Sequence, residues 1–337
     1  MRFDIALHIA AAAMSLPPAQ SVEAAIASGT CSRGAALRTA MRSVRVGDRA
    51  GPEYAADAAR AAVASAGVDP ADVGLVLHAD AYHQGHDLWA PASFVQQHSI
   101  GGNAFATEVR QLSNGGMAAL QLAAAYLAST DETAALLTAG DRFCPPGFDR
   151  WNTDPGTVYA DGGSALVLSR RTGFAVLRSI ATVSDPSLEV LVRGGDAFST
   201  GPLATRTPIS ISPELHRPRT GARLSTEEVL ARLRQGQQQA LDQALKDADV
   251  TKDDIAWFVV PHLGRPRMEL QMFDPLDIPV ARTTWDWGSG VGHLGAGDQY
   301  AGLAHLRDAG LLSPGSHCVL LGVGAGFAWS AAVLEVV

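Results

Sequence analysis

The most constraining feature of this sequence is a weak internal repeat. The segment AARAAVASAGVDPADVGLVLHAD returns as QALDQALKDADVTKDDIAWFVVPHL, and the alignment that places Val68 on Val250 also places Val73 on Ile255. Each copy predicts an Ala-rich helix, a turn and a short buried strand that ends at a polar residue. A repeated unit of this kind predicts a chain built from two halves of similar structure.

A second pair of similar segments extends the repeat along the chain. AALLTAGD (134–141) resembles VLLGVGAG (319–326), and the following GGSALVLS resembles AWSAAVLE. These runs are apolar without alternation, which is typical of strands that are covered by helices on both faces. We therefore expect an α/β protein with two pseudo-symmetric halves, residues 1–170 and residues 171–337.

The stretch 184–225, between the two halves, is rich in Pro, Ser, Thr and Arg. It predicts a loop or insertion, with a lid over a substrate entrance as one interpretation. The net charge of −8 argues against a nucleic-acid-binding protein, which would carry clustered Lys and Arg. Local groups of arginine fit either a phosphate-bearing partner or ordinary solvated surface. These arginines are Arg217, Arg219, Arg223, Arg265 and Arg267.

The cysteine content and the two ends of the chain bear on location. Three widely spaced cysteines without a CxxC pair predict neither a disulfide framework nor a zinc site, and favour a reducing cytoplasm. Asp4 and His8 interrupt the apolar N-terminal stretch and no basic region precedes it, which argues against a signal peptide. The uncharged stretch from Cys318 to Leu334 is divided by glycines, so we expect two buried strands joined by a turn instead of a membrane helix.

Ser113 lies where the sequence changes character. The strand-like segment TEVRQL precedes it, and the strongly helical stretch 117–128 follows it. Gly115 and Gly116 permit a tight backbone turn between the two. Such a turn directs a side chain out of the sheet at the positive end of a helix dipole, as nucleophile turns do. The alternative is that Ser113 only caps the helix.

Two histidines and two aspartates follow predicted strands or flank glycine-rich turns. VVPHLGRP places His262 directly after a buried strand, and GSGVGHLGAGD places His293 and Asp298 in a glycine-rich turn. VYADGGSALVLS places Asp161 before a strand. A single histidine is usually structural, but two of them in the second half, with a serine turn in the first, favour an active site.

Taken together, these segments resemble the ketoacyl-ACP synthase III branch of the thiolase superfamily. YADGGSALVL resembles the family's GDGAGA segment, and GVGAGFAWSAAVLEV resembles its C-terminal GGGLTWGA segment. VPHLGRP resembles the PHQAN segment, whose histidine falls on His262. TEVRQLSNGGMAAL and GHLGAGD resemble the segments in which the family's cysteine and asparagine fall on Ser113 and His293. The resemblance implies a thiolase fold with a five-layer αβαβα core, a homodimer, acyl-coenzyme A or acyl-carrier thioester substrates, and no cofactor.

The two departures from the family pattern are coupled chemically. A cysteine at a helix N-terminus can be partly ionised without a dedicated base, whereas a serine hydroxyl needs a general base beside it. An asparagine cannot be that base, but His293 can, and Asp298 could orient its imidazole. We therefore predict Ser113 as nucleophile, His293 as base and Asp298 as its orienting partner, with His262 as a further catalytic histidine.

Three functions follow from this reading. The first is transfer of an acyl group from coenzyme A or a carrier protein, through acyl-Ser113, to a hydroxyl or amino acceptor. Members of the family in antibiotic pathways that carry a His-Asp pair in this segment resemble such acyltransferases. The second is a starter-unit ketosynthase that performs decarboxylative condensation, in which His262 and His293 would hold the enolate oxygen. The third is a non-catalytic partner subunit that keeps the fold.

Further residues are candidates for substrate binding. The polar and aromatic loop AYHQGHDLWAPASF offers His83, His86, Asp87 and Trp89 to an acceptor pocket. Its histidine spacing is weak evidence for a metal, and we expect none. Arg150 resembles the arginine that stacks on the adenine of coenzyme A in this family. The backbone N–H groups of Ser113 and of the turn at Gly326 are candidates for an oxyanion hole.

Overall fold

The computed structural model describes residues 1, 3–194, 198–201, 207–211 and 224–337. Arg217, Arg219 and Arg223, and much of the predicted lid, lie outside the described residues. The main strands are hydrogen-bonded in the order β5-β4-β6-β7-β1-β8-β11-β10-β9. Their bounds are β1 His8–Ser15, β4 Val73–Ala79, β5 Phe105–Val109, β6 Ala134–Asp141, β7 Gly162–Ser169, β8 Ala175–Ser184, β9 Ile255–Val259, β10 His317–Gly324 and β11 Ala328–Val336.

This strand order consists of two similar sets, which we call the N-terminal and C-terminal leaves. In the N-terminal leaf β5, β4 and β6 are parallel, while β7 and β1 are antiparallel to their neighbours. In the C-terminal leaf β9 and β10 are parallel, and β11 and β8 complete it in antiparallel order. Among the described residues, strand pairing between the two leaves occurs only where His8 and Ile9 of β1 pair with β8.

The predicted repeat is confirmed by the start of one strand in each leaf. β4 begins at Val73 and β9 at Ile255, each directly after a short 3-10 turn that ends at an aspartate, Asp72 or Asp254. The boundary that we placed at residue 170 stays a prediction.

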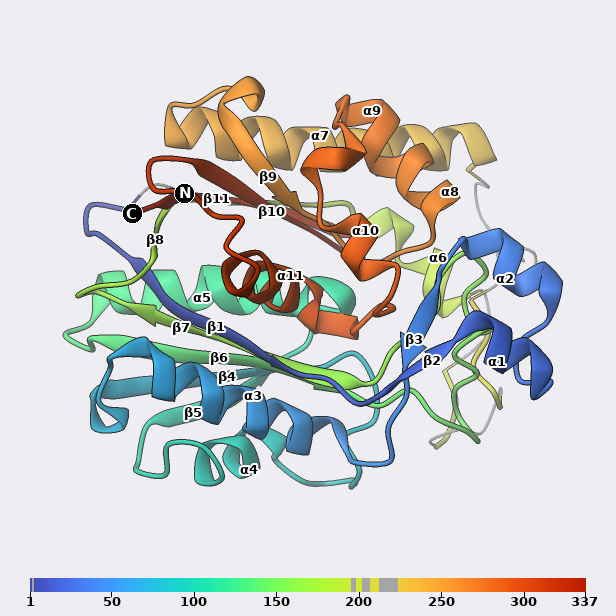
Figure 1. Cartoon of the computed structure of the whole chain (residues 1–337), viewed down its shortest axis with the longest axis horizontal. Coiled ribbons are helices and arrows are strands. Elements are labelled where there is room, and N and C mark those ends of the chain that lie inside the picture. The colour runs from blue at the N-terminus through green and yellow to red at the C-terminus, as the bar shows by residue number, and fades with distance from the viewer. Residues whose placement is uncertain (2, 195–197, 202–206, 212–223) are drawn as a thin grey trace.

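Helices cover and separate the two leaves (Figure 1). α3, Gly51–Ala66, packs on the outer face of the N-terminal leaf, and α7, Thr226–Ala248, packs on β8 and β11 of the other. α5, Gly115–Ser129, and α11, Asp298–Asp308, lie between the leaves. α5 is made mainly of Ala and Leu because it is enclosed between two sheets, which leaves little of its surface for polar side chains. The five layers that the sequence predicts are therefore present.

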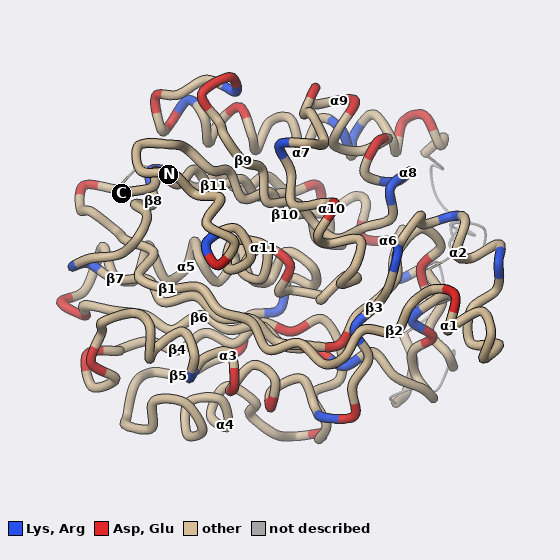
Figure 2. Tube along the Cα trace, in the orientation of Figure 1, with Lys and Arg blue, Asp and Glu red and all other residues tan. Residues whose placement is uncertain are grey.

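The remaining elements are short. They are β2 Ala19–Ser21, β3 Ser43–Arg45, α1 Val22–Ala27, α2 Arg33–Thr39, α4 Pro91–Gln97, α6 Val190–Arg193, α8 Arg265–Met268, α9 Asp274–Leu276 and α10 Trp285–Gly288. Figure 2 shows that the charged residues lie mainly on outer helices and loops, and that the central strands carry few of them.

The C-terminal apolar stretch folds as the sequence predicts. It forms β10 and β11, which pair in an antiparallel hairpin from His317↔Glu335 to Gly324↔Ala328. No helix within the described residues combines the length and the apolar character needed to cross a membrane.

Candidate active site

Ser113 lies in a constrained turn between β5 and α5. The turn is a short 3-10 segment, Leu112–Asn114, and Leu112 has a φ of 47°, which a residue with a side chain rarely adopts. Such strained conformations are concentrated at functional sites. The N-cap of α5 is Asn114, and the Ser113 hydroxyl bonds to an imidazole instead of to the helix backbone. The alternative that Ser113 only caps the helix is therefore wrong.

A second turn from the C-terminal leaf packs against the Ser113 turn. It carries His293 and continues through a 3-10 segment, Gly295–Gly297, into α11. A Cβ atom at Gly116 would lie 2.5 Å from the carbonyl oxygen of Ala296, so only glycine allows this approach. Gly116 is therefore needed to bring the two turns together.

The two turns complete a hydrogen-bonded chain of three side chains. The Ser113 Oγ lies 2.7 Å from the His293 Nε2, and the His293 Nδ1 lies 2.6 Å from the Asp298 Oδ2. Since a carboxylate only accepts, His293 carries its proton on Nδ1, and its Nε2 lone pair faces the serine hydroxyl. The structure thus brings together the three residues predicted from the sequence, while their catalytic roles remain proposals.

Asp298 also holds His262, which the sequence did not reveal. The backbone N–H of His262 donates to Asp298 Oδ2 at 2.8 Å, and the His262 Nδ1 lies 3.2 Å from Oδ1 of the same carboxylate. The N–H of Leu294 donates to Oδ1 as well. Burial alone would raise the pKa of the Asp298 carboxyl, but the facing His262 and His293 and these hydrogen bonds together hold that pKa below its ordinary value. Asp298 is therefore an anion at neutral pH.

The His262 ring is fully buried and its contacts fix its proton. Burial lowers the pKa of His262 against the opposing effect of Asp298, so the ring is neutral at neutral pH. Its Nδ1 also lies 3.0 Å from the carbonyl oxygen of Gly292. Because this carbonyl and the carboxylate only accept, the single proton of the neutral ring is on Nδ1. Among the described residues, nothing bonds to its Nε2.

Two buried aspartates that sequence reasoning undervalued support the site. Asp161 accepts from the backbone N–H groups of Gly47 and Phe143 and forms an ion pair with Arg150. Asp141, at the end of β6, accepts from Ala81 and Tyr82 and so holds the start of the loop after β4. Burial raises the pKa of Asp141 well above its ordinary value. The sequence signal for Asp141 is a charged residue at the end of an unbroken apolar strand.

The loop residues predicted to bind substrate lie apart from the triad contacts. His83 and Asp87 are exposed and face each other at 3.8 Å, while the rings of His86 and Trp89 pack edge to face at 5.5 Å. Within the described part of the chain, no hydrogen bond, ion pair or ring contact joins these residues to Ser113, His262 or His293. Also within that part, no cluster of metal-ligating side chains is present. A role in an acceptor pocket stays a prediction.

Arg150 and Gly326 have different surroundings from those the resemblance suggests. The Arg150 guanidinium is largely buried, bonds to the Tyr159 carbonyl and pairs with Asp161 at 3.0 Å, so it is already engaged inside the protein. Gly326 lies in the turn between β10 and β11, and a Cβ atom there would meet nothing nearer than 4.0 Å. The end of β10, just before that turn, packs on the Ser113 turn, because a Cβ atom at Gly324 would lie 2.4 Å from the Gln111 carbonyl oxygen. Adenine stacking and oxyanion binding stay predictions.

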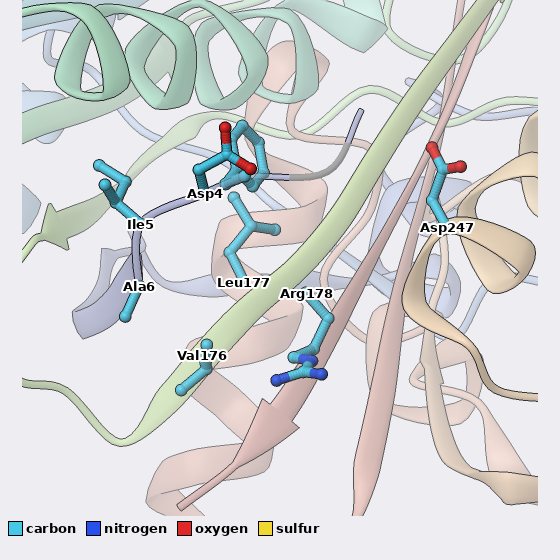
Figure 3. A pocket seen from close by; sticks show the side chains of 8 residues that line it. Asp4, Ile5, Ala6, Val176, Leu177, Arg178 and Asp247 are labelled. Carbon is cyan, nitrogen blue, oxygen red and sulfur yellow. The ribbon is translucent and has the colours of Figure 1, made fainter.

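A surface hollow lies at the other end of the strands. Figure 3 shows it between the N-terminal segment and the start of β8, with Asp247 at its edge. Val176 in its lining pairs with Glu335, which pairs with His317 at the start of β10. Ser113 and His262 follow the opposite, carboxyl ends of β5 and β9, so this hollow is separate from the candidate site.

Comparison with known proteins agrees with this geometry. Residues 245–336 match the model of the C-terminal domain of 3-oxoacyl-[acyl-carrier-protein] synthase III. The solved structure of ChlB3, an acyltransferase, is 34% identical, covers 98% of each chain and superposes with a TM-score of 0.90. The chain belongs to the ketoacyl-ACP synthase III-like family of the thiolase superfamily. The β-ketoacyl-ACP synthase III of Rhizorhabdus wittichii is 28% identical over 83% of this chain and 82% of its own. The corresponding Pseudomonas aeruginosa structure, 23% identical with a TM-score of 0.77 and 98–99% coverage, shares the fold.

In this ketoacyl synthase III-like site, His262 depends on the absence of a side chain at Gly288. A Cβ atom there would lie 2.4 Å from the His262 Cδ2, while hydrogen bonds prevent the ring from withdrawing. We expect Gly288→Ala to destabilise the fold by about 1–3 kcal/mol through overpacking. Thermal denaturation measures this. Gly290→Ala is the matched control, since its nearest contact would be 3.4 Å; equal losses for both variants would contradict the prediction.

Proposed function

We propose that this protein is an acyltransferase. It takes an acyl group from a thioester of coenzyme A or of an acyl carrier protein, holds it as an ester on Ser113, and passes it to a hydroxyl or amino acceptor. The observation that carries this proposal is the continuous chain Ser113–His293–Asp298, with distances of 2.7 Å and 2.6 Å. The acceptor chemistry would fit secondary metabolism, including antibiotic biosynthesis.

The chain of contacts accounts for the loading step. Ser113 Oγ attacks the thioester carbonyl carbon and gives its proton to His293 Nε2. The anionic Asp298 stabilises the resulting imidazolium through its 2.6 Å contact with Nδ1. The tetrahedral intermediate then expels the thiolate, whose ordinary pKa near 8.5 allows it to depart as an anion. The product is acyl-Ser113.

Two observations favour acyl transfer to oxygen or nitrogen. His293 is committed to Ser113, and attack on an acyl-serine ester by an alcohol or amine requires a base but no enolate support. The similarity to ChlB3, which is described as an acyltransferase, supports the same reading.

The second candidate is a starter-unit ketosynthase. It is favoured by the curated relatives, such as the 28% identical Rhizorhabdus wittichii protein, which are β-ketoacyl-ACP synthases III. Decarboxylative condensation would release CO₂ from a malonyl carrier thioester once Ser113 is loaded. Measuring that CO₂ distinguishes the two candidates: we expect none above the level of a Ser113→Ala variant.

Assembly and location complete the proposal. β5 is the edge strand of the N-terminal leaf, and the exposed fraction of Phe105 at its start is 60%. An open edge strand with an exposed aromatic residue is suited to pairing with a second copy, which supports the proposed homodimer. We further propose a cytoplasmic protein without a cofactor.

The test of the proposed function is direct detection of the acyl-enzyme. Incubated with a panel of acyl-coenzyme A and acyl-carrier thioesters, the protein should gain the mass of one acyl group, localised to Ser113 by peptide mapping. The Ser113→Ala variant should gain none. A panel that leaves the intact mass unchanged, or an adduct that persists in Ser113→Ala, would contradict the proposal.

A further inference from the structure

The two carboxylate oxygens of Asp298 contact two different imidazole rings. Its Oδ2 accepts from His293 Nδ1, and its Oδ1 lies 3.2 Å from His262 Nδ1. All three side chains are almost completely buried, so a single negative charge is shared by two rings away from solvent. The arrangement fixes both rings with the proton on Nδ1 and a lone pair on Nε2.

The two lone pairs have different surroundings. The His293 Nε2 is occupied by the Ser113 hydroxyl at 2.7 Å. The His262 Nε2 has no hydrogen-bond partner among the described residues although it is buried. A buried polar atom without a hydrogen-bond partner lowers the stability of the fold. Such an atom in a native structure calls for an explanation, for example a substrate group that donates the missing hydrogen bond.

The same protonation argues against a donor role for His262. To donate from Nε2, the neutral ring would have to lose the proton on Nδ1, and that nitrogen would then face a carbonyl oxygen and a carboxylate without a hydrogen between them. Three lone pairs would oppose one another in a buried site. The ring therefore offers a hydrogen-bond acceptor, not a donor, at Nε2.

We propose that His262 Nε2 is the base that takes the proton of the acceptor, so that the two histidines divide the reaction between them. This inference rests on the proposed acyl-Ser113 function. His293 accepts the proton of the Ser113 hydroxyl, and His262 accepts the proton of the incoming hydroxyl or amino group. Asp298 stabilises the positive charge on each ring.

The steps balance in protons and bonds. After loading, the thiolate has left and the Ser113 proton is on His293. In the transfer step the acceptor oxygen or nitrogen bonds to the acyl carbon and its proton passes to His262 Nε2. The bond from the acyl carbon to Ser113 Oγ then breaks, and Oγ recovers the proton from His293. His262 finally releases its proton to solvent, and this proton balances the negative charge of the departed thiolate.

The test separates the two half-reactions in the full-length protein. Loading is followed by thiol release and intact mass after one equivalent of acyl-coenzyme A. Transfer is followed by the decay of isolated acyl-Ser113 in the presence of ethanol, and separately of hydroxylamine. His262→Asn keeps an N–H for the Gly292 carbonyl but has no Nε2. His262→Gln places an amide donor near the Nε2 position.

We expect both variants to slow transfer to ethanol at least 30-fold more than they slow loading, since general bases contribute about 10²- to 10⁴-fold. Hydroxylamine, a strong nucleophile that depends less on a base, should restore part of the rate. His305→Asn is the matched control, because its ring stacks on Trp287, which in turn packs on His262. It should change both half-reactions equally and by little.

Each other outcome overturns the inference. Equal loss of loading and transfer in His262→Asn would make His262 a structural residue. Full transfer by His262→Gln would make it a donor, and undiminished transfer by both variants would remove it from the reaction. If the unaltered protein forms no acyl-Ser113 at all, the proposed function itself fails, which is a different result from normal loading with unchanged transfer.

Discussion

Replacing His293 with asparagine, the residue the family normally has there, is expected to slow acyl loading of Ser113 by about 10²- to 10⁴-fold. The loss follows from the 2.7 Å contact between Ser113 Oγ and His293 Nε2, because a serine hydroxyl does not ionise without a base at that position. Single-turnover mass spectrometry with a loading acyl-coenzyme A measures the rate.

The same change in a Ser113→Cys background is the control. A thiol at the start of α5 can be partly ionised by its surroundings, so His293→Asn should cost much less there than in the serine protein. The difference between the two losses is the coupling energy between nucleophile and base. Equal losses in both backgrounds would mean that His293 acts on the site by some route other than as base for the serine.

Asp298→Asn is expected to reduce loading by about 10⁴-fold, the size of the effect of the corresponding change in other Ser-His-Asp sites. An amide N–H facing His293 Nδ1 would favour the tautomer with the proton on Nε2. In that tautomer Nε2 has no lone pair to accept the Ser113 proton. The loss should appear in the loading rate with little change in the folded structure. Asp286→Asn is the matched control, because that side chain is 84% exposed and forms a surface ion pair with Arg42; a comparable loss in this variant would refute the role of Asp298.

The stability of the protein should also depend on Asp298 in a defined pH range. The pKa of its carboxyl is lower in the folded protein than in the unfolded chain, so it stabilises the fold fully above the ordinary carboxyl pKa. That stabilisation is lost as the pH falls through the lowered pKa. Thermal unfolding should therefore show a gap between the unaltered protein and Asp298→Asn at neutral pH that narrows in acid. A gap that widens as the pH falls would contradict this sign.

The sequence predicted those features that depend on local patterns. The repeat that aligned Val73 with Ile255 depends on where buried strands begin, and unbroken apolar runs mark such strands directly. Ser113 was recognisable because a strand pattern turns into a helix pattern around two glycines. His293 and Asp298 lie only five residues apart, so one turn can bring them together.

Contacts between distant segments were not predictable in the same way. The hydrogen bond between His262 and Asp298 joins residues that are 36 positions apart. Helices lie between them in the sequence, so residue spacing alone does not predict this contact. The resemblance places Arg150 at the adenine of coenzyme A, and the sequence does not show that its buried guanidinium pairs with Asp161. The loop with His83 and Asp87 has the composition of a binding site, yet its orientation depends on Asp141, which holds its first residues from another strand.

In the part of the chain that the structure describes, the two leaves share strand pairing only at His8 and Ile9 of β1, and the candidate site is divided between them. The hydroxyl comes from the turn after β5, whereas both imidazoles and the shared carboxylate follow β9. A nascent chain with only its first leaf folded has an alcohol with no base to activate it, and an isolated second leaf has bases without an alcohol. Under the proposed function, acylation of Ser113 therefore requires that both leaves have docked, and the rate at which the ester appears during refolding would report the rate of that docking.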